Sequence, residues 1–263
     1  MAINRWTEAE TKRALYLYFQ LPFGLLHKGN PEIIGLAHSM GRTPSSIAMK
    51  LVNFASLDPK IIETGRKGLD GASALDRKMW AEFNDDWTRL ILEVETGENE
   101  TNLSGRAVRE PAEAFIHQEF VGPTTVSALI EQRIGQGFFR RAVLANYDNK
   151  CCLTGIADVR LLNASHIMPW SSDEKNRHNP RNGLCLSATF DRAFDRGLMA
   201  VNDNGEALFS AQLLGSDSKE TRAFFQPYHR KALLGASRFE PDPAFLKWHH
   251  DHLFERNPID ARL

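Results

Sequence analysis

The stretch "NASHIMPW", Asn163–Trp170, follows a hydrophobic segment that is typical of a buried β-strand. The strand predicted over residues 159–165 ends on the ionisable ring of His166, and Pro169 restricts the backbone three residues later. A single histidine at the end of a strand is usually a packed or partly solvated side chain. The next thirty residues give a reason to expect a catalytic role for His166.

Those residues predict a loop, a second strand and a short helix, each carrying polar groups. A polar loop over residues 171–181, expected to be flexible, leads to a strand that opens on Asn182. A short helix follows and ends at Gly197. Asp191 and Asp195 lie four residues apart on this helix and therefore share one face. The order strand, loop, strand, helix predicts that these side chains converge with His166.

The two aspartates point to a metal ion. Carboxylates on one helical face repel each other unless positive charge lies near them, and oxygen ligands suit Mg²⁺ or Mn²⁺. The alternative is two solvated aspartates beside Arg192 and Arg196. The nearby histidine and asparagine favour the metal.

Residues 151–198 resemble the HNH endonucleases, which share the ββα-metal fold. The segments that carry the resemblance are "TG", "LLNASHIMPW", "NGLCLS" and "FDRAFDRGL". The flanks "FFRRAVLANYDNKCCLTG" and "PDPAFLKWHHDHLF" are also similar to segments of bacterial HNH proteins, so the resemblance covers most of residues 137–255. It implies an α+β fold in which a ββα-metal nuclease domain has flanking helices.

The resemblance also implies roles for individual residues. His166 matches the general base, and Asn182 matches the asparagine that orients the base or supports the metal site. Asp191 stands where the family usually has a metal-binding histidine, and Asp195 where some members place a further ligand. Ser165 occupies a position that is often a ligating Asp or His, so the metal shell is expected to need water there.

The implied activity is metal-dependent hydrolysis of DNA. Mg²⁺ or Mn²⁺ neutralises the leaving oxygen, while His166, neutral near pH 7, takes a proton from water. The expected ends are 5′-phosphate and 3′-hydroxyl. The domain order resembles restriction or phage-defence nucleases, and sensitivity to base modification is a further hypothesis. The alternative is a DNA-binding or scaffold protein with a silent HNH fold, which the departures at Ser165 and Asp191 support. One centre cuts one strand, so a homodimer is a further hypothesis.

The first sixty residues predict helices with clear starts, at Thr7 with Glu10, at Asn30 and at Thr43. The last two helices have the spacing of a helix-turn-helix unit. The DNA contacts predicted for this module are Arg42, Ser45, Ser46, Lys50 and Asn53. The alternative is a three-helix bundle that docks on another domain.

The chain is predicted to divide into three parts. Residues 1–95 form a helical, DNA-recognition domain that ends with one long amphipathic helix starting after Ser73. Residues 96–111 are a polar linker, and residues 112–263 form the nuclease domain.

Basic side chains around the nuclease motif are candidates for phosphate contact as a group. They are Lys175, Arg177, Arg181, Arg192 and Arg196. We expect His178 to be solvated, and the histidines within residues 249–252 to serve packing and surface roles and not to bind a metal.

Composition excludes some classes of protein. The 263 residues contain 32 basic and 33 acidic side chains, so any DNA contact must use local patches. No run approaches the ~18 apolar residues of a membrane span, and the charged start does not resemble a signal peptide, which predicts a cytosolic protein. Three cysteines, two of them adjacent, favour buried thiols over structural zinc.

Overall fold

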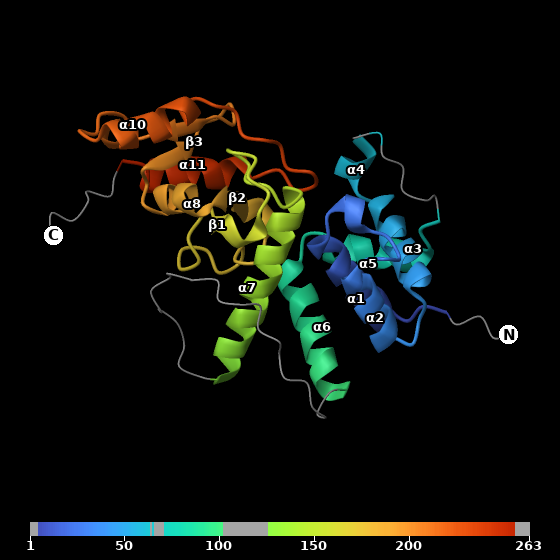
Figure 1. The fold of residues 1–263 in the computed structure, drawn as a ribbon. Coiled ribbons are helices and arrows are strands. Elements are labelled where there is room, and N and C mark those ends of the chain that lie inside the picture. Colours follow the sequence, from blue (N-terminus) through green and yellow to red (C-terminus); the bar gives the residue numbers. More distant parts are fainter. Residues whose placement is uncertain (1–4, 64, 66–70, 102–125, 256–263) are drawn as a thin grey trace. The chain divides into compact units, whose positions relative to one another are not determined.

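A computed structural model describes residues 5–63, 65, 71–101 and 126–255 of the chain (Figure 1). The contacts divide the chain into two compact units, Met1–Ala142 and Val143–Leu263. None of the described helices is long and apolar enough to cross a membrane.

The first unit is helical. Its elements are α1 (Glu8–Gln20), a 3₁₀ turn (Phe23–Leu25), α2 (Pro31–Ser39), α3 (Pro44–Ala55), α4 (Pro59–Glu63), α5 (Ala74–Phe83) and α6 (Trp87–Thr101). Helix α1 packs against α3, α5 and α6, and α2 packs against α3. The side chains of Tyr18, Phe19, Phe54 and Phe83 fill the interior with aromatic rings.

The predicted helix starts are confirmed. Thr7 and Glu10 form a capping box at α1, in which the Thr7 hydroxyl accepts from the Glu10 N–H and the Glu10 carboxylate accepts from the Thr7 N–H. Asn30 caps α2, and Thr43 caps α3. Between these two helices Gly41 adopts a φ of +61°, a conformation that costs glycine little. The helix-turn-helix character of the pair remains a prediction.

The single long helix predicted after Ser73 is wrong, because the structure has two helices there. Helix α5 ends at Phe83, and α6 begins at Trp87. Between them lies Asn84–Asp86, and the Asp86 carboxylate accepts a hydrogen bond from the Arg89 N–H, as a helix cap does. Phe83 and Trp87 are four residues apart, so the helical spacing of apolar residues continues across the break. Periodicity alone therefore does not reveal that α5 ends there.

The boundary between the units also differs from the predicted linker over residues 96–111. Helix α6 continues through Thr101, and the rest of that linker lies outside the described residues. The division falls between Ala142 and Val143, within helix α7 (Val126–Asn146).

The second unit contains the ββα arrangement. Strands β1 (Leu162–His166) and β2 (Gly183–Ser187) pair antiparallel, with Ser165 opposite Leu184 and His166 opposite Gly183. Helix α8 (Ala188–Asp195) follows directly and packs against both strands. Residues 159–161, predicted as strand, form a 3₁₀ turn instead, capped by the Asp158 side chain. All three cysteines are buried, as predicted.

Further elements surround this core. They are β3 (Met199–Val201), β4 (Ala207–Phe209), α9 (Ala211–Leu214), α10 (Lys219–Phe225), 3₁₀ turns at Pro180–Asn182 and Gln226–Tyr228, and α11 (Pro243–His252). Strands β3 and β4 pair antiparallel, and α11 packs against β3. Gly197, after α8, has a φ of +65°, and a Cβ there would overlap the carbonyl oxygen of Leu253. The end of α8 and the end of α11 therefore meet backbone to backbone.

Candidate active site

His166 lies at the end of β1 with its ring held by the loop that follows. Its Nε2 lies 3.0 Å from the carbonyl oxygen of Arg177, and a carbonyl can only accept, so this nitrogen carries the proton. The basic nitrogen of the neutral ring is then Nδ1. Burial lowers the pKa of His166 to about 4, which keeps the ring neutral at pH 7.

Asn182 supports this arrangement through the backbone. Its side chain is 1% exposed. The Oδ1 accepts from the Met168 N–H at 2.8 Å, while Nδ2 donates to the carbonyls of Met168 and Asn176 at 3.2 and 3.3 Å. The amide thus holds both ends of the loop, and Asn176 directly precedes the residue whose carbonyl accepts from His166. Its influence on the histidine passes through the loop.

The loop over residues 171–181, expected to be flexible, is closely hydrogen-bonded. The Asp173 carboxylate accepts from the N–H groups of Lys175 and Asn176 and from the Asn176 side chain. Asn179 donates to the Asn176 side chain and accepts from the Arg181 N–H. Short polar side chains that bond to nearby backbone in this way stabilise a turn without a core.

Asp191 faces β1 from helix α8. Its Oδ2 accepts from Asn163 Nδ2 at 2.6 Å, and its Oδ1 accepts from the Ser165 hydroxyl. Ser165, 2% exposed and predicted to contribute to a metal site, uses its hydroxyl to hold this carboxylate. Sequence reasoning missed Asn163, although its spacing of two residues from Ser165 places both on one face of the strand.

The alternation of side chains along β1 separates the two halves of the site. Ser165 points toward α8, so the next residue, His166, leaves the strand on the other face, toward the loop. Both oxygens of Asp191 bond to Asn163 and Ser165, and the ring of His166 bonds to Arg177. The structure therefore brings together one group around His166 and another around Asp191, joined through the last two residues of β1.

Asp195 completes the second group. Desolvation and the neighbouring Asp191 carboxylate raise its pKa to about 7, against the opposing effect of Arg192 and Arg196, although the side chain keeps contact with solvent. A cation would relieve this repulsion. No group of three or more His, Cys, Asp or Glu side chains in the described part of the chain is arranged to hold a metal. Two carboxylates suit a Mg²⁺-type ion, which keeps several waters and takes few protein ligands.

The basic residues predicted around the motif differ in their surroundings. Lys175, Arg192 and Arg196 are exposed. Arg181 lies with its guanidinium 5.9 Å from the ring of Phe239. Arg177 turns inward, and its Nε donates to the carbonyl of Trp170 at 2.8 Å. The exposed members are the ones that remain candidates for phosphate contact.

Two predictions about histidines have different outcomes. The expectation that His178 is solvated is wrong, because its ring packs against Trp170 at 5.4 Å and burial, with Arg177, lowers its pKa to about 4. The expectation that the histidines of residues 249–252 serve packing and surface roles is confirmed. His249 is 1% exposed, whereas His250 and His252 lie on the surface.

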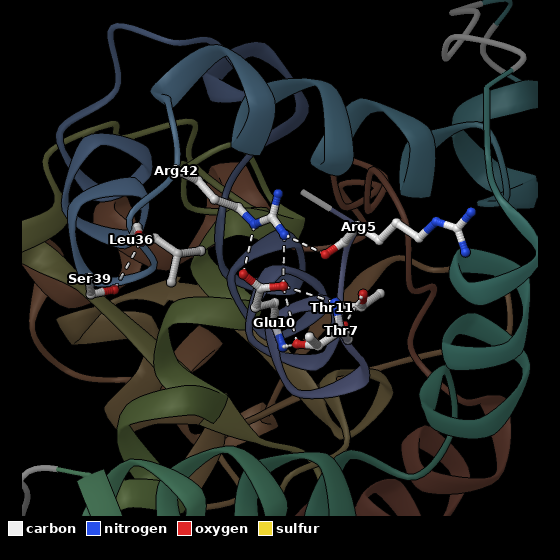
Figure 2. A network of polar contacts seen from close by, with 7 residues as sticks. All are labelled: Arg5, Thr7, Glu10, Thr11, Leu36, Ser39 and Arg42. Carbon is white, nitrogen blue, oxygen red and sulfur yellow. Dashed lines mark hydrogen bonds and ion pairs between the residues drawn. The ribbon is translucent and has the colours of Figure 1, made fainter. Parts of the chain in front are cut away.

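In the first unit, the structure contradicts the prediction that Arg42 and Lys50 are presented on the surface. Arg42 donates through Nε and Nη2 to both oxygens of Glu10 at 2.8 Å, and also to the carbonyl of Arg5 (Figure 2). Lys50 pairs with the buried Asp76. Both side chains are 5% exposed, and both cations lie over the ring of Trp6, at 4.2 and 4.4 Å. These charges stabilise the unit.

The other residues predicted to read DNA have mixed positions. Ser45 is exposed on α3, and Ser46 is half-buried, with its N–H donating to the cap Thr43. Asn53 is also half-buried, and its Oδ1 would lie 3.3 Å from a Cβ placed on Gly71. Of the five predicted contacts, Ser45 is the one that the structure leaves fully on the surface.

Residues 151–202 match the model of the HNH endonuclease family. The matched segment contains β1, β2, α8 and β3, and therefore both halves of the site. This match agrees with the resemblance of the segment to the HNH endonucleases that the sequence predicted. No curated protein matches the chain with significance.

Proposed function

We propose that the protein is a metal-dependent DNA endonuclease in which His166 is the general base. The observation that carries this proposal is the hydrogen bond from His166 Nε2 to the carbonyl of Arg177. Because a carbonyl oxygen can only accept, the proton lies on Nε2, and Nδ1 is the basic nitrogen of the neutral ring. Burial keeps the ring neutral, so the base is ready at pH 7 without prior deprotonation.

The chemistry follows from the two halves of the site. Nδ1 of His166 takes a proton from the attacking water, which contributes roughly 10²–10⁴-fold to the rate. A divalent ion held by Asp191 and Asp195 would neutralise the charge that develops on the phosphate and the leaving 3′ oxygen. Asn163 and Ser165 fix the orientation of Asp191, and Asn182 fixes the loop that orients His166. The family resemblance gives 5′-phosphate and 3′-hydroxyl ends.

We further propose a role in restriction or phage defence, with Mg²⁺ or Mn²⁺ as the cofactor and with cleavage that is sensitive to base modification. The support is the combination of a nuclease segment with a separate helical unit that can select the target. Among the predicted DNA contacts, the fully exposed residues are Ser45, Lys175, Arg192 and Arg196. A homodimer would let two such centres cut both strands, and we keep it as part of the proposal.

A cleavage assay on supercoiled plasmid and on base-modified DNA tests the activity. We expect nicked or linear product with Mg²⁺ or Mn²⁺, none with EDTA, and a rate at least about 100-fold lower for His166→Ala. His252→Ala, at an exposed histidine of α11, is the matched control and should cleave at the wild-type rate.

Two results would count against the proposal. One is cleavage by His166→Ala at the wild-type rate. The other is a folded wild-type protein that leaves every DNA substrate intact with either metal but retards the same DNA in a gel. That second result would favour the alternative of a DNA-binding protein with a silent nuclease fold.

A further inference from the structure

Three residues of the second unit form a closed circuit of contacts around the His166 ring. The first contact is the hydrogen bond from His166 Nε2 to the Arg177 carbonyl, at 3.0 Å. The second runs from Arg177 Nε to the carbonyl of Trp170, at 2.8 Å. The third closes the circuit, because the Trp170 ring meets the His166 ring edge to face at 5.6 Å and 89°. A shift at any one contact changes the other two.

Arg177 contributes both its backbone and its side chain to this circuit. Its carbonyl accepts from the histidine, while its guanidinium donates to Trp170 and lies 5.1 Å from the centre of the indole ring. The carboxylate of Glu174 pairs with Nη2 of the same guanidinium at 3.2 Å, and the side chain of Arg177 is 26% exposed. Lysine cannot replace it, because lysine has no N–H at the position of Nε and no planar group to stack on the ring.

Trp170 is confined from several directions. The ring of His178 packs on it at 5.4 Å, in addition to His166 and the guanidinium. Pro169 precedes it and restricts the backbone, and Asn182 holds the N–H and carbonyl of Met168 just before that. The indole therefore has a defined place from which it can set the plane of the histidine ring.

We propose that Trp170 and Arg177 are positioning residues that fix the tautomer and the ring plane of His166, so that Arg177 serves the base and not the DNA backbone. This inference rests on the proposed function, in which His166 Nδ1 is the base. In this role neither residue touches the reacting atoms. Their loss should therefore lower kcat and leave KM close to its wild-type value, because the substrate still binds while the base is misaligned.

The experiment combines a spectroscopic readout with kinetics on the full-length chain. Long-range ¹H–¹⁵N correlation spectra report which ring nitrogen of His166 is protonated, and they need neither substrate nor metal. The variants are Trp170→Phe, Trp170→Ala, Arg177→Lys and Arg177→Gln. Arg192→Gln serves as the contrast, because Arg192 is an exposed candidate for phosphate contact, and Arg160→Gln serves as the neutral control, because that side chain is 85% exposed.

We expect the wild type to show protonation at Nε2 alone. Trp170→Ala and both Arg177 variants should show a mixture of tautomers, with kcat lower by about ten- to hundredfold. Trp170→Phe keeps an aromatic edge and should give a smaller change in the tautomer mixture and in kcat. It can still be measured if Trp170→Ala fails to fold. Arg192→Gln should raise KM with an unchanged tautomer, and Arg160→Gln should match the wild type in both measurements.

The outcomes separate this inference from the proposed function. Unchanged tautomers in Trp170→Phe and Arg177→Lys, with or without a loss of kcat, would overturn the positioning role. A mixture of tautomers in the variants of a protein that cleaves no DNA would support the positioning role and count against the nuclease function. A KM effect in Arg177→Lys equal to that of Arg192→Gln, with a fixed tautomer, would return Arg177 to the DNA interface.

Discussion

The imidazole of His249 lies flat against the ring of Phe194, with 3.7 Å between the ring centroids and 10° between the planes. The same histidine, on α11, reaches the carbonyl of Phe194 with Nε2 at 3.1 Å. Phe194 directly precedes Asp195 on α8. Burial lowers the pKa of His249 to about 4, so the contact that anchors the acidic end of α8 uses a neutral ring.

This anchor predicts a loss of stability in mild acid. The pKa of His249 is about 4 in the folded state and about 6.5 in the unfolded chain, so the unfolded state binds more protons between these values. The free energy of unfolding therefore falls as the pH is lowered through this window, by about 2 kcal/mol between pH 7 and pH 5 from this one group. His249→Phe should remove that part of the pH dependence. Urea unfolding at the two pH values measures it.

The control is His252→Gln, which changes an exposed histidine of the same helix. It should keep the wild-type difference between pH 7 and pH 5. Because His166 and His178 have lowered pKa values as well, the informative quantity is the change between variants. An equal pH dependence in His249→Phe and the wild type would contradict the assignment.

Gly197→Ala should be strongly destabilising. A methyl group there would overlap the carbonyl of Leu253, and the φ of +65° is unfavourable for alanine. Gly205→Ala is the matched control, since Gly205 has a φ of +73° but no atom within 4 Å of the added carbon. The control isolates the backbone cost, about 1 kcal/mol. Denaturant unfolding should show a clearly larger loss for Gly197→Ala, and equal losses would mean that the α8–α11 contact is not this close.

The buried pair of Lys50 and Asp76 predicts a large effect in the first unit. Lys50→Met leaves the Asp76 carboxylate, 0% exposed, with the Ser73 N–H as its remaining partner, and should cost about 3–5 kcal/mol. Lys78→Met breaks an ion pair with Glu8 in which both side chains are more than half exposed, and it should change the stability far less, because solvent screens the pair. Similar urea midpoints for the two variants would refute the ranking.

The acidic pair predicts a metal-dependent rise in thermal stability. A cation that binds only the folded protein raises the melting temperature, so Mg²⁺ or Mn²⁺ should stabilise the wild type. Asp195→Asn should abolish this rise. In the absence of metal the same variant should melt no lower than the wild type, because it removes the repulsion from Asp191. Asp217→Asn, at an exposed aspartate, should respond to metal as the wild type does. Differential scanning calorimetry measures the melting temperatures. If neither metal raises the melting temperature of the wild type, this metal site is excluded.

Local signals in the sequence predicted the starts of α1, α2, α3 and α5 and the order of the ββα segment. Thr7, Asn30 and Thr43 cap helices through bonds to amides at most three residues away, so neighbouring residues suffice to predict them. The break at Asn84–Asp86 was missed because the apolar pattern continues through it. His166 and Asn182 stood out through their spacing in a motif, which does not require knowledge of the packing.

Whether a basic side chain forms an internal ion pair or stays exposed to solvent can depend on contacts between residues far apart in the sequence. Arg42 pairs with a carboxylate 32 residues away, and Lys50 with one 26 residues away. Arg177 contacts Trp170, only seven residues earlier, but the conformation of the loop that brings the two together could not be predicted from the sequence. A basic residue in a sequence therefore indicates a candidate for DNA contact, and the partners that fold against it determine whether the charge reaches solvent.

Ser165 and His166 are adjacent in β1 but have different roles, and the pleat of the strand directs their side chains to opposite faces. Deleting a single codon upstream of Ser165 within that strand would send the imidazole toward α8 and the hydroxyl toward the loop, if the pairing with β2 kept its alignment. Insertions or deletions of a single residue are therefore not tolerated within Leu162–His166, whatever changes in length the surrounding loops tolerate.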